Sequence, residues 1–216
     1  MGIVMGKKCF EASGTTLDPE IDPAIERASK FFGYYVGKGS IPYGEHEPWS
    51  GGHASNGKDQ MAALMFALQG NRPVETEYYT RMSVAGYNGR EYGHTGQGFS
   101  YVWGGPAANV GGTNAVASHL AQVRWHLDLS RRYDGTFVYD GGEQYGGSSV
   151  SSYSGSSSYA GIDPTASYVL TYALPKQQLY ITGKNANPTN WLSSAVVSNA
   201  IWVGAFNQVC AGYDTN

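Results

Sequence analysis

A six-residue pattern occurs twice in this chain, each time directly before a segment with helical periodicity. Its copies are Gly52-His53-Ala54-Ser55-Asn56-Gly57 and Gly93-His94-Thr95-Gly96-Gln97-Gly98, whose histidines lie 41 residues apart. Each copy combines Gly-His with an amide side chain and a closing glycine. Repetition at about 40 residues is typical of helical hairpins that stack on one another. The pattern therefore predicts a fold made of repeated helical hairpins.

Apolar residues recur at helical spacing in seven segments, whereas alternation at period two is scarce. Asp22-Pro23 and the stripe that follows predict a helix over 22–36, and a second helix is expected to open at Ser55 or Asn56 and stop near Gly70. Further helices are expected at about 74–85, after His94-Thr95, from a cap at Thr113 to about 127, between Asp163-Pro164 and Pro175, and over 193–206. The best strand candidate is short, 178–182. The fold class is therefore mainly α.

Hairpins of this length could form an open solenoid or close into a ring with inner and outer helices. The chain has 30 glycines, and its long Gly-rich loops favour the ring, an α/α toroid. Inner helices of such a ring begin at one rim, which would gather His53, His94 and Asp163. Seven helices are too few for a full ring of six hairpins. We therefore expect one domain over 1–216 with an incomplete toroid, completed by a second copy of the chain or by a missing domain.

Two segments between the helices have a distinct composition. The stretch 146–161 is mostly Ser, Gly and Tyr and almost uncharged, which is typical of a flexible loop or lid. The stretch from Asp134 to Tyr139 resembles the strand-like turn that links hairpins. Both are expected to lie outside the helical framework and to shape its surface.

Charge and hydropathy exclude two classes of protein. Lys and Arg total 14 against 17 Asp and Glu, and this net charge of −3 argues against a nucleic-acid binder. The apolar runs are too short for a membrane span. Met1 to Lys8 lacks the order of a signal peptide, and the compartment stays open, with a periplasmic or secreted location among the alternatives. Cys9 and Cys210 either pair, if the termini meet, or are two unrelated buried thiols.

The two histidines are the first candidates for chemistry. At a helix N-terminus the positive end of the macrodipole disfavours imidazolium, so His53 and His94 would be neutral near pH 7 and able to act as bases. The alternative is that each ring only caps its helix.

Charged and amide side chains crowd both copies of the pattern, although only 14% of residues are charged. Two carboxylates that straddle a bond can act as acid and base, and the segment 134–143 adds further acids. Aromatic rings beside them suit sugar rings, although ordinary packing or a structural bridge from Arg90 would also explain these residues. The catalytic candidates are His53, His94, Asp59, Glu91, Asp134 and Asp140, and the substrate-binding candidates are Asn56, Lys58, Arg90, Tyr92, Trp49 and Tyr139.

No cofactor or metal motif is present. The ligand-type residues Glu45, His46, His53 and His94 lack tight spacing, and we expect no metal site. His119 and His126 lie seven residues apart on one helix face, which favours a polar stripe or a partner pair over joint ligation. The sequence also lacks the Gly-x-Ser-x-Gly elbow and the phosphate-binding lysine loop, so no cofactor is expected.

Three stretches together resemble an uncharacterised bacterial domain family, found mostly in planctomycete-type bacteria. They are Gly51 to Lys58, Gly89 to Gly96 and Asp134 to Gly142, and the similarity covers about residues 20–190. The resemblance implies an α/α-toroid-like fold and no established activity.

The rim of acids and aromatic rings leads to a functional hypothesis. We expect a carbohydrate-active enzyme that cleaves glycosidic bonds in a polysaccharide, by hydrolysis or by β-elimination. This expectation rests on analogy with other α/α toroids, which often hold such sites at the rim of the inner helices. The alternative is a glycan-binding or assembly module without catalysis.

Overall fold

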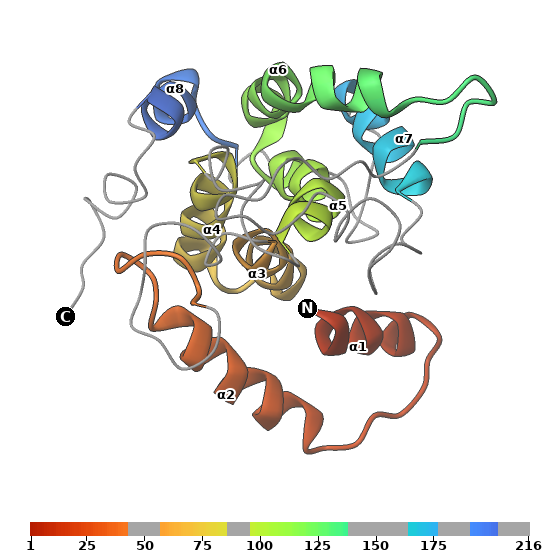
Figure 1. The fold of residues 1–216 in the computed structure, drawn as a ribbon. Helices are drawn as coiled ribbons and strands as arrows, with labels where there is room; N and C mark the ends of the chain where they lie inside the picture. Colours follow the sequence, from red (N-terminus) through yellow and green to blue (C-terminus); the bar gives the residue numbers. More distant parts are fainter. Residues whose placement is uncertain (43–56, 86–95, 138–163, 177–190, 203–216) are drawn as a thin grey trace.

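The computed structural model describes residues 1–42, 57–85, 96–137, 164–176 and 191–202 (Figure 1). Within these ranges the chain is helical and contains no strand, which confirms the mainly α prediction. None of the described helices combines the length and the apolar composition that a membrane span requires. The elements are α1 (Gly2–Ala12), α2 (Ile21–Gly33), α3 (Lys58–Gln69), α4 (Pro73–Ala85), α5 (Gly96–Val110), α6 (Gly112–Ser130), α7 (Thr165–Ala173), the 3₁₀ turn η4 (Leu174–Lys176) and α8 (Ser194–Trp202).

Most helix positions agree with the periodicity, and the exceptions have local causes. Helix α1 was not predicted. Helix α5 is longer than the short helix expected after His94-Thr95, because Gly96 and Gly98 weaken the helical pattern at its start. The expected cap at Thr113 is wrong: α6 starts at Gly112 without a side-chain cap, and Thr113 lies exposed in its first turn. The strand candidate 178–182 and the loop 146–161 lie outside the described residues.

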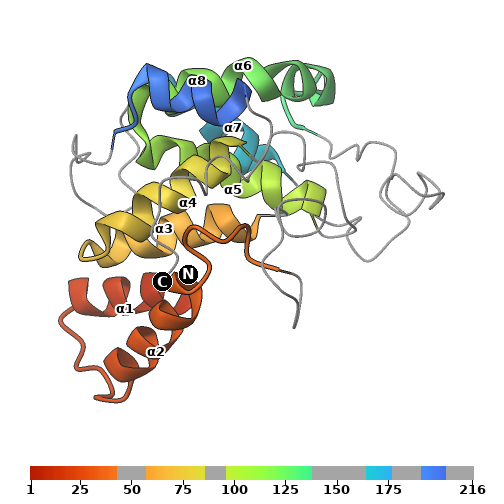
Figure 2. The same ribbon diagram turned by 90° about the vertical axis from the view of Figure 1, so that its left-hand side faces the viewer.

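Helices α3 to α6 form the centre of the molecule and alternate in direction. Figure 2 shows α3 and α5 running together with α4 reversed beside them. The ring of Tyr101 near the start of α5 stacks on His126 near the end of α6, which sets these two helices antiparallel. As a consequence, α3 and α5 begin on the same side of the molecule, as expected for two equivalent hairpins.

The largest apolar cluster lies between α3 and α4 and extends to α1, α5, α6 and α8. At its centre the rings of Phe66 and Tyr79 stack with centroids 5.7 Å apart, and both side chains are fully buried. Tyr79 still satisfies its hydroxyl by donating to the carbonyl oxygen of Phe32 at 2.6 Å. Burial of such large aromatic side chains supplies much of the free energy that holds the α3–α4 hairpin together.

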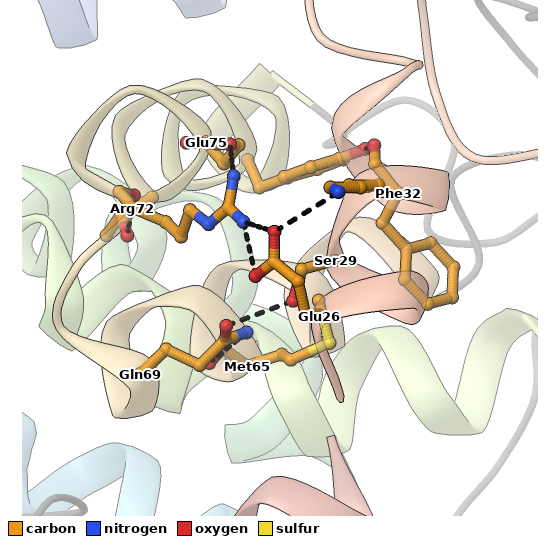
Figure 3. Close-up of polar contacts among 10 residues, drawn as sticks. Glu26, Ser29, Phe32, Met65, Gln69, Arg72 and Glu75 are labelled. Atoms are coloured by element: carbon orange, nitrogen blue, oxygen red, sulfur yellow. Dashed lines mark hydrogen bonds and ion pairs between the residues drawn. The ribbon is translucent and has the colours of Figure 1, made fainter. Parts of the chain in front are cut away.

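Helix α2 is fixed to this hairpin by polar contacts at the turn between α3 and α4 (Figure 3). Arg72 donates two hydrogen bonds of 2.6 Å to the carboxylate of Glu26, and its other terminal nitrogen lies 3.3 Å from Glu75. Nearby, the buried hydroxyl of Ser29 donates to the amide oxygen of Gln69 at 3.0 Å. Both oxygens of Glu26 accept from the single nitrogen Nη2, while Nη1 faces Glu75, so the guanidinium joins α2 to the start of α4.

Glycines let α5 approach its neighbours closely. A Cβ atom on Gly104 would lie 2.8 Å from the His119 ring of α6, and one on Gly105 would lie 2.6 Å from the Thr171 hydroxyl of α7. Real Cβ contacts are longer than this, so each position requires the absence of a side chain. Gly104 and Gly105 therefore create the surface on which α6 and α7 pack against α5.

The segment before α8 is fastened to the start of α6. The backbone N–H of Leu192 donates to the carbonyl of Gly111 at 2.8 Å, and the Asn114 amide donates to the carbonyl of Leu192 at 3.1 Å. Gly112 has φ +81° there, and a Cβ atom on it would lie 2.4 Å from Cγ of Trp191. The backbone conformation and the close aromatic ring both demand glycine.

Gly112→Ala should lower the free energy of unfolding by about 3 kcal/mol, because it combines left-handed strain with overpacking against Trp191. Gly135→Ala is the matched control, since Gly135 has φ +86° but open space around its Cα. The control should lose only about 1 kcal/mol. Urea denaturation of both variants measures the difference, and equal losses would show that the Trp191 contact carries no cost.

Candidate functional site

Two of the predicted site residues begin α3, directly after the first copy of the Gly-His pattern. Lys58 and Asp59 are the first and second residues of the helix, and Gly57 precedes them with φ +86°. Asp134 is the only other predicted site residue within the described ranges. The remaining ones, namely Trp49, His53, Asn56, Arg90, Glu91, Tyr92, His94, Tyr139 and Asp140, lie outside those ranges, as does Asp163.

The carboxylate of Asp59 is fully buried beneath the segment that follows α2. Its Oδ1 atom accepts a hydrogen bond of 3.1 Å from the backbone N–H of Ile41. Two residues earlier in the same segment, Tyr78 of α4 holds Gly39: its hydroxyl donates to the Gly39 carbonyl at 2.8 Å and accepts from the Gly39 N–H at 3.1 Å. Two buried side chains from the α3–α4 hairpin therefore hold the backbone around Ser40.

Burial dominates the electrostatics of this site. Desolvation raises the pKa of Asp59 to about 6, and this rise outweighs the lowering by the Ile41 N–H, the Ser40 side chain and the Lys58 charge. Desolvation also lowers the pKa of Lys58 to about 8, opposed by the negative charge of Asp59. An acid and an amine, both shifted toward neutrality, thus occupy consecutive positions at one helix start. Such shifts are typical of proton-transfer sites.

Several buried polar atoms around Asp59 have no hydrogen-bond partner among the described residues. They are Oδ2 of Asp59, Oγ of Ser40 and both amide atoms of Gln60. Ser40 affects the pKa of Asp59 from nearby without completing a hydrogen bond of ordinary geometry. Buried polar groups are nearly always paired, so these unpaired atoms make the start of α3 the candidate functional site.

Sequence reasoning identified Lys58 and Asp59 but missed Gln60 and Ser40. Gln60 stands at the third helical position, where a glutamine often reaches back to the N-cap backbone, and that position was the available signal. Here Gly57 provides no capping side chain, and the Gln60 amide makes no such bond. Ser40 carried no signal, because only the folded chain brings it beside residue 59.

Asp134 occupies a tight turn instead of a pocket. Its exposed carboxylate accepts hydrogen bonds from the backbone N–H and the hydroxyl of Thr136, at 3.0 and 2.7 Å, and these bonds lower its pKa. Gly135 has φ +86°, and Arg131 and Phe137 form an antiparallel bridge across the turn. This is the strand-like turn expected from the sequence. The geometry gives Asp134 a structural task, and its catalytic role stays a prediction.

The histidine pair on α6 forms buried contacts within the helical framework. His126 is stacked on Tyr101 with ring centroids 4.2 Å apart, and its Nε2 lies 3.3 Å from the hydroxyl of Tyr168 in α7. His119 faces Gly104 two turns away. Both rings are therefore buried between neighbouring helices, and they do not form an exposed polar stripe.

A cleft at the far end of α3 and the distribution of metal-ligand residues also bear on function. A cleft of about 500 Å³ lies at the opposite end of α3 from Asp59, and its lining is Val4, Lys7, Lys8, Asp22, Pro23, Ile25, Glu26, Gln69 and Asn71. Lys7 is already paired there with Asp22 and Glu11. Over the described parts of the chain, no group of three or more His, Cys, Asp or Glu side chains could hold a metal ion.

Cys9 departs from the expectation of a buried thiol. It is a free cysteine, and it lies exposed on the outer surface of α1. Cys210 lies outside the described residues.

The family model for a domain of unknown function, DUF6288, matches residues 1–183. The chain belongs to the DUF6288 family. The match includes α1 to η4 and the whole Asp59 site, and α8 lies beyond it. Membership agrees with the resemblance to an uncharacterised domain family. No curated protein and no solved structure matches this DUF6288 chain.

Asp59→Asn should remove a pH-dependent cost to stability. A folded pKa of about 6, above the ordinary 3.8, means that the folded state holds the proton more tightly than the unfolded state between these values. The wild-type free energy of unfolding therefore falls relative to the variant as pH rises from 4 to 7.5, by about 2 kcal/mol. The asparagine keeps an oxygen acceptor for the Ile41 N–H.

Urea denaturation at pH 4, 5.5 and 7.5 measures this difference between variant and wild type. Asp18→Asn is the control, since Asp18 is exposed and its replacement can still accept the hydrogen bond from the Glu20 N–H. A constant difference between Asp59→Asn and wild type across this pH range would contradict a desolvated carboxyl.

Proposed function

We propose that this protein is an enzyme that cleaves glycosidic bonds in a polysaccharide, with Asp59 as the carboxyl that transfers the proton. One observation carries the proposal: the carboxyl of Asp59 is buried, has a pKa of about 6, and has an oxygen without a partner among the described residues. A carboxylic acid that keeps its proton to about pH 6 is suited to protonate the oxygen of a leaving sugar.

The neighbouring groups support this chemistry. The start of α3 lacks a side-chain cap, so its first backbone N–H groups and the positive end of the helix dipole favour an oxygen-rich ligand. Lys58 adds a half-buried amine whose lowered pKa of about 8 still leaves it mostly protonated at pH 7. Glu91 or Asp140, both predicted from the sequence, would supply the second carboxylate, and His53 and His94 belong to the same proposed rim.

Access to Asp59 follows from the same proposal. The carboxyl is fully covered in the free chain, so part of that cover must open when a sugar binds. Trp49, Tyr92 and Tyr139 are proposed to contact the sugar faces, and Asn56 and Arg90 its polar groups. In the β-elimination variant of the reaction, Asn56 and Arg90 would neutralise a uronate carboxylate while a histidine removes the proton.

The proposed architecture is the incomplete α/α toroid. Its support is the common direction of α3 and α5, which start on one side as the inner helices of a ring would (Figure 2). The ring would be completed by a second copy or by a further domain. Light scattering on the purified chain tests the first alternative, which requires a dimer or larger oligomer.

The activity is tested by incubating the full chain with neutral and uronate polysaccharides, following reducing ends and the absorbance of unsaturated products. Hydrolysis should release reducing ends without that absorbance. Asp59→Asn should lower kcat/KM by at least about a hundredfold, because general acid catalysis contributes roughly 10²–10⁴. In the wild type, kcat/KM should fall tenfold per pH unit above about pH 6 as the acid loses its proton.

Asp18→Asn should retain wild-type turnover and serves as the matched control. Unsaturated products would show that the reaction is β-elimination and not hydrolysis. A glycan that binds without turnover would favour the glycan-binding module, and turnover that survives in Asp59→Asn would remove Asp59 from the mechanism.

A further inference from the structure

The amide of Gln60 is the least explained buried group in the described structure. Its side chain has no exposed surface, and neither its nitrogen nor its oxygen has a hydrogen-bond partner among the described residues. A carboxamide offers two donors and an acceptor with two lone pairs, so four hydrogen bonds are unmade. Leaving such a group unpaired in the interior costs stability.

A second glutamine on the same helix shows how a glutamine amide is ordinarily hydrogen-bonded. Gln69, the last residue of α3, accepts a hydrogen bond from the Ser29 hydroxyl at 3.0 Å and donates to the Met65 carbonyl at 3.5 Å. Gln60 lies in the first turn of α3 and Gln69 in the last, and only the latter is satisfied within the described structure. The unpaired state of Gln60 is therefore a property of its place and not of its residue type.

The place of Gln60 is the start of α3, beside Asp59. Side chains on a helix lean toward its N-terminus, so the amide at the third helical position lies over the same end as Lys58 and Asp59. The Oδ2 atom of Asp59 and the Oγ atom of Ser40 are unpaired there as well. Buried side chains with unpaired atoms thus occupy the first turn of α3 and the adjoining segment at Ser40, at a helix end that has no side-chain cap.

We propose that Gln60 is a substrate-binding residue that recognises a pair of neighbouring sugar hydroxyls. A carboxamide can donate to one hydroxyl oxygen and accept from the next, a pairing that fits vicinal hydroxyls on a pyranose ring. This inference rests on the proposed function and deepens it, since it assigns recognition of the sugar adjoining the scissile bond to Gln60. Ligand binding would supply the hydrogen bonds that the free chain lacks.

The test uses Gln60→Met, which fills the same volume without polar atoms. If the amide is unpaired in the free chain, its removal should raise Tm by roughly 2–4 °C. Affinity for the preferred probe among cellohexaose, xylohexaose and hexagalacturonate should fall by roughly tenfold to a hundredfold, measured by calorimetry in the Asp59→Asn background to prevent cleavage. The two readouts move in opposite directions, which a merely structural residue would not produce.

Gln69→Met is the matched control on the same helix. It leaves the buried Ser29 hydroxyl without its partner and should lower Tm while leaving glycan affinity unchanged. A lower Tm for Gln60→Met would show that the amide is already satisfied, and an unchanged glycan affinity would show that it does not touch the sugar. Either result overturns the role of Gln60 while the proposed function stands. Absence of binding and turnover with every wild-type probe would instead overturn the proposed function, and the role of Gln60 with it.

Discussion

The removal of the Asp59 carboxylate from water is the constraint on which the α3 end of the molecule depends. A buried carboxylate is tolerated only where donors meet it, and within the described part of the chain the backbone N–H of Ile41 does so at 3.1 Å. That bond ties the segment after α2 to the start of α3, while the hydroxyl of Tyr78 ties the same segment to α4. Lys58 lies beside Asp59 and lowers its pKa in turn. The local fold and the raised pKa of Asp59 have the same origin.

The rest of the framework presents α3 at the centre of its neighbours. Arg72 fixes α2 against the turn that follows α3, and the stacked Phe66 and Tyr79 rings join α3 to α4. Gly104 and Gly105 then let α5 pack closely against α6 and α7. Because most of these contacts are specific in shape or direction, α3 is held from several sides. A helix held in this way can keep polar groups unpaired at its first turn without unravelling there.

The sequence predicted those parts of the structure that are governed by local periodicity. Met61, Leu64, Met65 and Leu68 marked α3 because a helix repeats its buried face every three to four residues. Helix α5 was underestimated, since its glycines lower helix propensity and only tertiary packing shows their value. The residue type of Thr113 indicates an N-cap, whereas the chain starts α6 with a left-handed glycine at position 112.

The candidate site was likewise predictable only where the evidence lies in the local sequence. Lys58 and Asp59 were found because charged residues are rare in this chain and these two follow the repeated Gly-His pattern. Their pKa shifts could not be found in this way, because desolvation depends on the segment around Ser40, which is distant in sequence and close only in the fold. Asp134 is the opposite case: its sequence context of acids and aromatic residues suggests a site, but in the structure its carboxylate accepts two hydrogen bonds from Thr136 within its own turn.

The two ends of α3 differ in a way that packing alone does not explain. At its C-terminal end, Gln69 and Ser29 satisfy one another, and Arg72 is matched by Glu26 and Glu75. At its N-terminal end, Asp59, Gln60 and Ser40 retain unpaired atoms in the interior. An apolar side chain of similar size would be more stable at position 60, where it would break no hydrogen bond among the described residues. A sequence that keeps polar groups where they weaken the fold does so most simply because those groups act on something else, and proteins commonly accept this loss of stability at functional sites.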